Sequence, residues 1–260
     1  MSISISACII TLNEEDILDS CLKSLDFVDE IIIVDSHSTD KTLEIAKKYK
    51  AKIFLRNFDN YVNQKNFCLE QASNNWILAV DADEIVSQDL KKEIIQLKEK
   101  NFSEFEAFYL PRLSFYLGKW IYHGGWYPNY QIRLFKKDNA KFEGQLVHEK
   151  VTTSGKLSYL KNPLLHYSYK NISDHLKFID KYSDLTAKER AREEKSSSVL
   201  LAVGKAFWKF IWMYFFRLGI LDGKVGLIIA ILGSYYNFLK YVKVFEFKID
   251  KSAKTFTSKT

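Results

Sequence analysis

Trp76-Ile-Leu-Ala-Val-Asp81-Ala-Asp83-Glu84 is an apolar run, typical of a buried β-strand, that ends in three carboxylates within four residues. Open α/β sheets bind their ligands at the carboxyl ends of parallel strands. Carboxylates at such an end suit a hard divalent cation in front of a phosphorylated ligand. The alternative is a strand followed by the acidic first turn of a helix, since Asp and Glu favour helix N-termini. The rest of the chain decides between the two.

Similar apolar runs precede this stretch and alternate with helical patterns. We expect strands at residues 3–11, 30–35, 51–55 and 76–80, and helices ending near residue 25, at 41–49 and at 62–72. This alternation indicates βαβ units and a mostly parallel sheet with flanking helices, that is, an α/β fold with a Rossmann-like layer. Neither Gly-X-Gly-X-X-Gly nor the P-loop motif occurs in it, which argues against a dinucleotide cofactor and a P-loop enzyme.

Length and composition narrow the class of protein. A chain of 260 residues accommodates one α/β domain with an appended region. The net charge of +6 comes from basic residues spread along the chain, which fits an acidic membrane surface or a phosphate-bearing substrate, and we expect no nucleic acid. Cys8, Cys21 and Cys68 lack metal-ligand spacing and are expected to be reduced. The N-terminal segment has no basic region before an apolar run, which predicts no secretory signal and a cytoplasmic location.

Polar clusters follow three of the four expected strands. These are Thr11-Leu-Asn13-Glu14, Asp35-Ser36-His-Ser-Thr-Asp40 and Asp81-Ala82-Asp83. Because the carboxyl ends of parallel strands share one edge of the sheet, the clusters converge on one cleft. In this order they resemble the motifs of inverting family-2 glycosyltransferases with a GT-A fold. The resemblance covers residues 1–85 closely and extends to about residue 170. It implies an enzyme that takes a sugar from a nucleoside diphosphate.

The resemblance assigns the donor nucleotide to residues at the ends of these strands: Thr11, Asn13, Glu14, Asp35, Ser36, Asp81 and Ala82. Within this set, Asp35 is expected to accept a hydrogen bond from the base. Ser36 and Asp40 have a competing role in capping the following helix, which we favour for Asp40. Lys65 is expected either to neutralise the diphosphate or to be an ordinary solvated helix lysine.

The same resemblance implies a divalent metal, Mn²⁺ or Mg²⁺, with Asp83 as its first ligand. The ion would stabilise the negative charge on the departing diphosphate. His166 is preferred to His148 as a further ligand, although a histidine near aromatic residues is also common in protein cores. Glu149 is the expected base that takes the acceptor proton. The structural alternative is a buried Glu149 paired with Lys150 or Arg133.

An aromatic, glycine-rich run at Gly118–Pro128 is the expected acceptor site, where Trp126 or Tyr127 stacks on a sugar. A packed loop with core aromatic residues is the alternative. The further candidates for acceptor binding are His123, Arg133 and His148. His123-Gly-Gly-Trp-Tyr-Pro128, together with Val147-His-Glu149, resembles bacterial glucosyltransferases that extend a heptose in the lipopolysaccharide inner core. That resemblance implies glucose from UDP as the transferred sugar and a lipid-linked saccharide acceptor.

The domain organisation follows from these patterns. We expect a GT-A domain at residues 1–172, with donor binding in 1–100 and the acceptor side in 101–172, a helical region at 173–246 and a basic tail at 247–260. The helical region is expected to associate with the membrane or to form a homo-oligomer.

An apolar segment at Val199–Leu221 is nearly long enough to span a bilayer. Its cations, Lys205, Lys209 and Arg217, make insertion costly, at roughly 2.5–3.5 kcal/mol each at the bilayer centre. We expect the lysines on a face opposite Trp208, Trp212 and Phe215, a turn at 219–223 and a second helix at 225–239. This pattern predicts a helical hairpin lying peripherally on the inner face of the cytoplasmic membrane. A helical subdomain packed on the sheet or a dimer interface is the alternative.

Two other functions remain open. A sugar nucleotidyltransferase shares an α/β nucleotide-binding layer, but the glycine-rich N-terminal loop expected there is missing. A non-catalytic nucleotide-sugar-binding membrane protein would retain the fold without turnover. The presence of both Asp83 and Glu149 argues against it.

Overall fold

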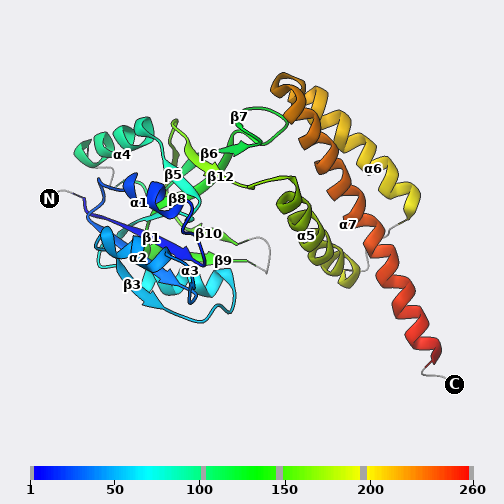
Figure 1. The fold of residues 1–260 in the computed structure, drawn as a ribbon, viewed down its shortest axis with the longest axis horizontal. Helices are drawn as coiled ribbons and strands as arrows, with labels where there is room; N and C mark the ends of the chain where they lie inside the picture. Colours follow the sequence, from blue (N-terminus) through cyan, green and yellow to red (C-terminus); the bar gives the residue numbers. More distant parts are fainter. Residues whose placement is uncertain (1–2, 101–103, 145–148, 194–197, 258–260) are drawn as a thin grey trace. The chain divides into compact units, whose positions relative to one another are not determined.

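The computed structural model describes residues 3–100, 104–144, 149–193 and 198–257 (Figure 1). The chain divides into two compact units, one made of Met1–Ser114 and Pro128–Ser168, the other of Phe115–Tyr127 and Tyr169–Thr260. The predicted boundary at residue 172 lies close to the second division. In contrast, the aromatic loop expected on the acceptor side of the first domain belongs to the second unit.

The N-terminal half of the first unit alternates strands and helices. In chain order these are β1 (Ile5–Thr11), α1 (Leu18–Lys23), β2 (Glu30–Asp35), α2 (Thr42–Lys48), β3 (Lys52–Leu55), α3 (Tyr61–Glu70) and β4 (Trp76–Ala79). β1 pairs in parallel with both β2 and β4, and β2 pairs in parallel with β3, which gives the order β3-β2-β1-β4. The predicted parallel α/β layer is therefore confirmed.

The rest of this unit extends the sheet with antiparallel strands. Its elements are β5 (Glu84–Val86), α4 (Gln88–Lys100), β6 (Ala107–Tyr116, whose last two residues belong to the second unit), β8 (Asn129–Lys136), η1 (Lys137–Asn139), β9 (Ala140–Glu143), β10 (Lys150–Thr153), β11 (Leu157–Tyr159) and β12 (Leu164–Tyr167). The order continues as β4-β8-β6-β12-β5, with β8 antiparallel to β4 and β6 and β12 antiparallel to β5. β9 and β10 form a separate antiparallel pair.

Burial on both faces explains the continuous apolar runs of the central strands. Ala7 and Ile9 of β1 belong to the core cluster that includes Leu18 and Leu22 of α1. Cys8, which points to the opposite face, belongs to the cluster that contains residues of α3. The packed core thus holds the carboxyl ends of β1, β2 and β4 in register along one edge.

The second unit is mainly helical. It contains β7 (Lys119–Ile121), α5 (Ile172–Arg192), α6 (Val199–Ile211), a π-helical turn η2 (Trp212–Phe216), a 3₁₀ turn η3 (Gly219–Asp222) and α7 (Gly223–Thr257). Hydrogen bonds join α6 to α7, from Ser234 Oγ to the Ala206 carbonyl at 2.7 Å and from Asn237 Nδ2 to the Lys205 carbonyl at 2.8 Å. An ion pair of 2.8 Å between Lys243 Nζ and Asp180 Oδ1 joins α7 to α5.

Two expectations for this region were wrong. The second helix runs from Gly223 to Thr257, well beyond the predicted 225–239, and it includes most of the residues expected to form a separate tail. Lys209 does not lie opposite Trp212, because its Nζ is 4.9 Å from the centre of the Trp212 ring. One helical turn separates the two residues, so they share a side of the helix.

Apolar side chains of α6 and of the turn that follows it are exposed. Leu200 is 83% exposed, Phe207 67% and Phe216 66%. The segments Val199–Phe216 and Gly219–Phe247 are long and apolar enough to cross a membrane, judged by length and composition alone. This unit therefore presents an apolar surface that its own packing does not cover.

Candidate functional site

The loops after β1 and β2 are bound to each other through the carboxylate of Asp35, which is fully buried. Its Oδ2 accepts hydrogen bonds from Thr11 Oγ1 at 2.8 Å and from Ser38 Oγ at 2.5 Å, and its Oδ1 accepts one from the Ser38 amide at 2.7 Å. Asn13 Oδ1 accepts a further bond from the Thr39 amide at 2.8 Å. Both oxygens of Asp35 are thus bonded within the protein, and its role in base binding stays a prediction.

The remaining polar residues of these loops connect to the helices beside them. The Glu14 amide donates to Thr42 Oγ1 at 2.8 Å, at the start of α2. Ser36 Oγ accepts from Gln64 Nε2 of α3 at 3.1 Å. Asp40 Oδ1 accepts from the Thr42 amide at 3.0 Å. The N-cap residue of α2 is Lys41, which makes no side-chain capping bond, so Asp40 contacts the first turn from just before the helix. Ser36 joins its loop to α3.

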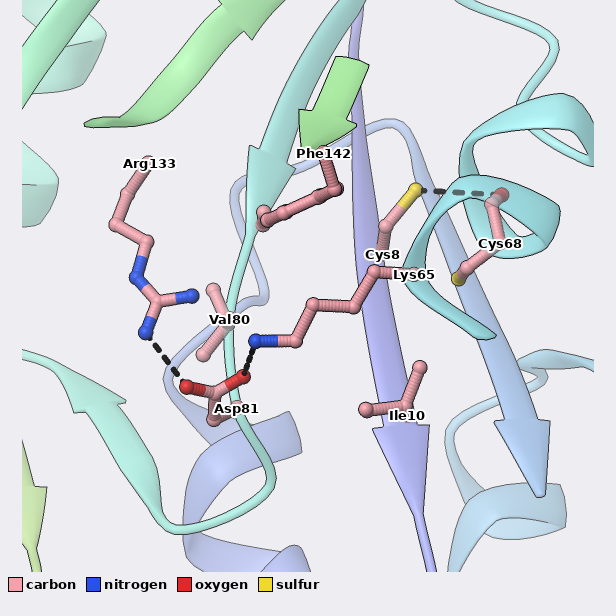
Figure 2. Close-up of a pocket in the computed structure, with 9 residues that line it drawn as sticks. Cys8, Ile10, Lys65, Cys68, Val80, Asp81, Arg133 and Phe142 are labelled. Atoms are coloured by element: carbon pink, nitrogen blue, oxygen red, sulfur yellow. Dashed lines mark hydrogen bonds and ion pairs between the residues drawn. The ribbon is translucent and has the colours of Figure 1, made fainter. Parts of the chain in front are cut away.

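Asp81 lies between two cations just beyond β4 (Figure 2). Its Oδ1 is 3.0 Å from Lys65 Nζ, and its Oδ2 is 2.6 Å from Arg133 Nη2. Burial disfavours the charged form, but Arg133 and Lys65 outweigh it and hold the pKa of Asp81 well below its usual range. Ala82, the next residue, is buried. The Asp81 carboxylate is thus ionised and fixed in orientation.

Lys65 connects Asp81 to Glu149, the predicted base. Its Nζ is 3.3 Å from Glu149 Oε1 and 5.4 Å from the centre of the Phe142 ring. Only 10% of the Lys65 side chain is exposed, which excludes the solvated helix lysine considered above. The structural alternative for Glu149 named the wrong partners, because its carboxylate pairs with Lys65 rather than with Lys150 or Arg133.

Glu84, the third carboxylate of the motif, is completely buried. Its Oε1 is 2.8 Å from Arg133 Nη2 and 3.5 Å from Arg112 Nη1, and its Oε2 accepts from the Asp81 amide at 2.9 Å. Glu84 therefore orients both Arg133 and the backbone of the motif. Arg133, which was expected to bind the acceptor, lies almost buried beneath Asp81, and its contact with an acceptor stays a prediction.

Asp83 and His166 meet because β12 pairs with β5. The pairing sets His166 opposite Glu84, and the Tyr167 amide donates to the Asp83 carbonyl at 3.0 Å. His166 Nε2 is 3.2 Å from Asp83 Oδ2, and its Nδ1 is 3.3 Å from Ser114 Oγ. The two predicted metal ligands are therefore adjacent.

A carboxylate and an imidazole at this separation suit a divalent cation that takes its remaining ligands from phosphate and water. The Asp83 side chain is 33% exposed and is accessible to such an ion. Within the described ranges, no group of three His, Cys, Asp or Glu residues is placed to hold a metal. Metal binding here would therefore depend on oxygens that a phosphorylated ligand brings.

A cavity of about 280 Å³ opens beside Asp81. Its lining consists of Lys65, Asp81, Arg112, Gln131, Ile132, Arg133, Phe142, Glu149, Lys150 and Val151. Asp81 and Glu149 come from distant parts of the chain and face this common space. An anionic ligand and a general base could thus be brought together here.

The predicted acceptor residues of the aromatic loop lie in the second unit. The His123 amide donates to Asp222 Oδ2 at 2.9 Å, and its Nδ1 is 3.2 Å from Asp222 Oδ1. The Trp126 ring contacts those of Tyr116 and Tyr169. Such packing corresponds to the alternative of a packed loop, and the acceptor roles of His123, Trp126 and Tyr127 stay predictions. His148 lies outside the described residues.

Sequence reasoning missed Arg112 and Ser114, which lie near the site on β6. The signal for them is the alternation along this strand, where Leu110, Arg112 and Ser114 point to the same face. A charged side chain within a mostly buried strand indicates a partner nearby. That partner, Glu84, precedes Arg112 by 28 residues, which local patterns do not reveal.

Known proteins similar to this chain include several glycosyltransferases. An uncharacterized glycosyltransferase of Rickettsia typhi is 30% identical over 256 residues, which cover 94% of this chain and 88% of the relative. The lipopolysaccharide core biosynthesis glycosyltransferase LpsC of Rhizobium meliloti is 28% identical, with 93% of this chain and 92% of that protein covered.

Among solved structures, TarS of S. aureus (residues 1–349) has a TM-score of 0.48 at 16% identity, with 96% of this chain and 92% of that chain covered. The family model described as glycosyl transferase family 2 matches residues 6–153. That range includes the three strand-end motifs, Lys65, Arg133 and Glu149. The chain belongs to glycosyl transferase family 2.

Proposed function

We propose that this enzyme transfers a hexose, glucose in the first instance, from a UDP-sugar to a lipid-linked saccharide such as lipopolysaccharide core, with inversion at the anomeric carbon. The observation that carries the proposal is the shared cavity of Asp81 and Glu149, joined by Lys65. Similarity to LpsC over nearly the whole chain supports the class of acceptor.

In the proposed reaction, an acceptor hydroxyl attacks the anomeric carbon on the face opposite the diphosphate. The new carbon–oxygen bond forms as the bond to the diphosphate breaks, and Glu149 takes the hydroxyl proton. Lys65 Nζ, 3.3 Å from Glu149 Oε1, orients this carboxylate. Lys65 also provides positive charge near the leaving group.

Asp83 and His166 would hold the divalent cation, Mn²⁺ or Mg²⁺. When bound, such an ion supplies the charge that stabilises a departing diphosphate. The buried pair of Glu84 and Arg133 keeps the preceding Asp81 in place, so the ligand loop does not have to reorganise on binding.

The exposed apolar surface of α6 and α7 supports binding to the cytoplasmic face of a membrane. Phe207 and Trp208 are more than half exposed, and lysines of α6 accompany them. Helices of this kind bind the lipid interface by burying apolar side chains while cations contact phosphates. A lipid-linked acceptor would be presented at that interface. Self-association through the same surface is the competing proposal.

The test of the function is release of nucleoside diphosphate from UDP-, GDP- and dTDP-sugars, with Mn²⁺ or Mg²⁺ and core oligosaccharide acceptors. We expect metal-dependent release from a UDP-sugar by wild type. Glu149→Gln should lose about 10²–10⁴-fold in kcat while still binding the donor. Asp83→Ala should lose metal dependence together with activity. Glu44→Gln, an exposed change on α2, is the matched control.

Full activity of Glu149→Gln would reject the base assignment without affecting family membership. Donor binding by wild type without turnover on any acceptor would favour a non-catalytic binding protein. Release of pyrophosphate from a nucleoside triphosphate and a sugar phosphate would instead identify a sugar nucleotidyltransferase.

A further inference from the structure

Basic side chains outnumber carboxylates in the lining of the cavity beside Asp81. Four basic side chains and two carboxylates line it: Lys65, Arg112, Arg133, Lys150, Asp81 and Glu149. Lys65 and Arg133 are each paired with two carboxylates. Arg112 Nη1 is 3.5 Å from Glu84 Oε1, the same oxygen that Arg133 Nη2 contacts at 2.8 Å. Lys150 makes no ion pair with any residue that the structure describes.

Two arginines of the lining also have an unpaired donor. The Nε atoms of Arg112 and Arg133 are buried and have no hydrogen-bond partner among the described residues. The Arg133 side chain is only 7% exposed. Each Nε is a buried donor without an acceptor in the described part of the chain, which is uncommon in proteins. The excess of basic side chains in the lining favours an anionic ligand.

These cations lie on the side of Asp81 where the acceptor, rather than the donor nucleoside, is expected. The strand order β2-β1-β4-β8-β6 puts β4, and with it Asp81, between the two halves of the sheet. Arg112 and Gln131 come from β6 and β8, and Lys150 begins β10. The loops after β1 and β2, where the donor nucleoside is expected, contribute no residue to the lining of this cavity. An anion bound here would lie beyond Asp81, beside Glu149.

We propose that Arg112, Lys150 and Gln131 bind a phosphate group carried by the acceptor saccharide, close to the hydroxyl that receives the sugar. This inference rests on the proposed function, since it takes Glu149 as the base in the same cavity. A phosphate has three oxygens for donors that arrive from three different strands. One arginine fork alone would satisfy a carboxylate, which makes phosphate the better match.

Isothermal titration of the full-length protein tests the proposal, with mannose 6-phosphate, mannose and glucuronate as probes. The titrations are made with saturating UDP and Mg²⁺, so that the donor site is filled. We expect mannose 6-phosphate to bind and mannose to bind at least about tenfold more weakly. Arg112→Gln and Lys150→Gln should each weaken binding of mannose 6-phosphate about tenfold or more. Arg112→Lys, which keeps the charge, should lose less.

Lys48→Gln is the matched control, because it also removes an exposed lysine. Lys48 belongs to α2, which connects β2 and β3, whereas Arg112 and Gln131 come from β6 and β8. Lys150 is exposed, so its variant tests the site even if Arg112→Gln disturbs the buried Glu84. If Lys48→Gln weakened binding of mannose 6-phosphate equally, the net charge of the protein would explain the effect, and the proposal would be wrong.

Three further outcomes would contradict it. Competition between mannose 6-phosphate and UDP would assign the cavity to the donor diphosphate. Equal binding of glucuronate would reject phosphate as the preferred group, and equal binding of mannose would reject anion recognition. Failure of the proposed function is a separate result, since it would appear as absent UDP binding or absent sugar transfer while the phosphate titration without UDP remains measurable.

Discussion

At the scale of single residues, three neighbouring carboxylates have three different environments. Glu84 is buried against two arginines, Asp81 is held between Lys65 and Arg133, and Asp83 is partly exposed beside a histidine. Their chemistry follows from these surroundings rather than from residue type. The buried one supports the loop, and the exposed one is available to a ligand.

Glu84→Ala is expected to destabilise the first unit by about 3–5 kcal/mol, because it leaves Arg133 as a buried charge with one partner fewer. The free energy of unfolding in urea measures this loss. Glu44→Ala, an exposed change on α2, should stay within about 0.5 kcal/mol of wild type. Equal stability of the two variants would show that Glu84 does not support the loop.

Lys65→Met is expected to make the protein more sensitive to acid. The pKa of Asp81 is lowered in the folded state, so its contribution to stability is present above its ordinary pKa of about 3.9 and is lost as the pH falls through the folded value. Without Lys65 the pKa of Asp81 in the folded state rises, and part of the contribution of Asp81 to stability disappears. Acid titration followed by circular dichroism should show unfolding at a higher pH than in wild type. Lys48→Met is the control, and an unchanged midpoint in Lys65→Met would contradict the expectation.

At the scale of elements, pairing between strands distant in the chain builds the site. β12 carries His166 to Asp83, and β6 carries Arg112 to Glu84. In the second unit, α5 is fixed through His175, whose ring stacks on Tyr169 with centroids 4.2 Å apart and whose Nδ1 is 3.1 Å from the Tyr116 hydroxyl. Burial lowers the pKa of His175 to about 4.

The stability of the second unit should therefore decrease as the solution becomes mildly acidic. A neutral buried His175 stabilises the fold above the unfolded pKa of about 6.5, and this contribution is lost as the pH falls toward the folded value of about 4. Between about pH 7.5 and about pH 5 the loss is about 2 kcal/mol. Thermal unfolding at the two pH values measures it.

His175→Phe retains the ring stacking and has no titrating group, so its stability should depend less on pH over this range. His37→Asn, at an exposed position with a φ of 63°, is the control, because asparagine tolerates that backbone conformation. If the pH dependence were the same in wild type and His175→Phe, another group would be responsible.

At the scale of the whole molecule, one unit of the chain contains a charged cavity, and the other has an exposed apolar helical surface. Wild type is expected to sediment with vesicles that contain anionic phosphatidylglycerol, and more weakly with phosphatidylcholine alone. Phe207→Ser combined with Trp208→Ser should reduce sedimentation at least about tenfold, because two exposed aromatic side chains are removed from the lipid-facing surface.

Leu55→Ser combined with Phe58→Ser is the matched control, since these exposed apolar residues belong to the first unit. Sedimentation equilibrium of the same proteins distinguishes the other proposal. If wild type formed a stable dimer that ignored vesicles, and the Phe207 and Trp208 changes dissociated it, the surface would be an oligomer interface.

The sequence by itself determined the parallel layer and the family. Strand and helix patterns, and motifs such as Asp81-Ala-Asp83, depend on residues that are neighbours in the sequence. An apolar run predicts a buried strand, and the polar residues that follow it predict the loop where the strand ends. The predicted strand at residues 30–35 agrees with β2, and the other strands of this layer differ by one or two residues at an end. The π-helical turn and the length of α7 were missed, because an apolar pattern does not mark where such helices end.

Only the tertiary structure decided which charges meet. Lys65 lies 84 residues from Glu149, and Arg133 lies 49 residues from Glu84. No local pattern encodes these pairs, since each depends on the sheet order and on the antiparallel addition of β8 to β4. Burial then determined their roles, because the electrostatic energy of a charge depends on the solvent and partners around it, and folding alone brings these together.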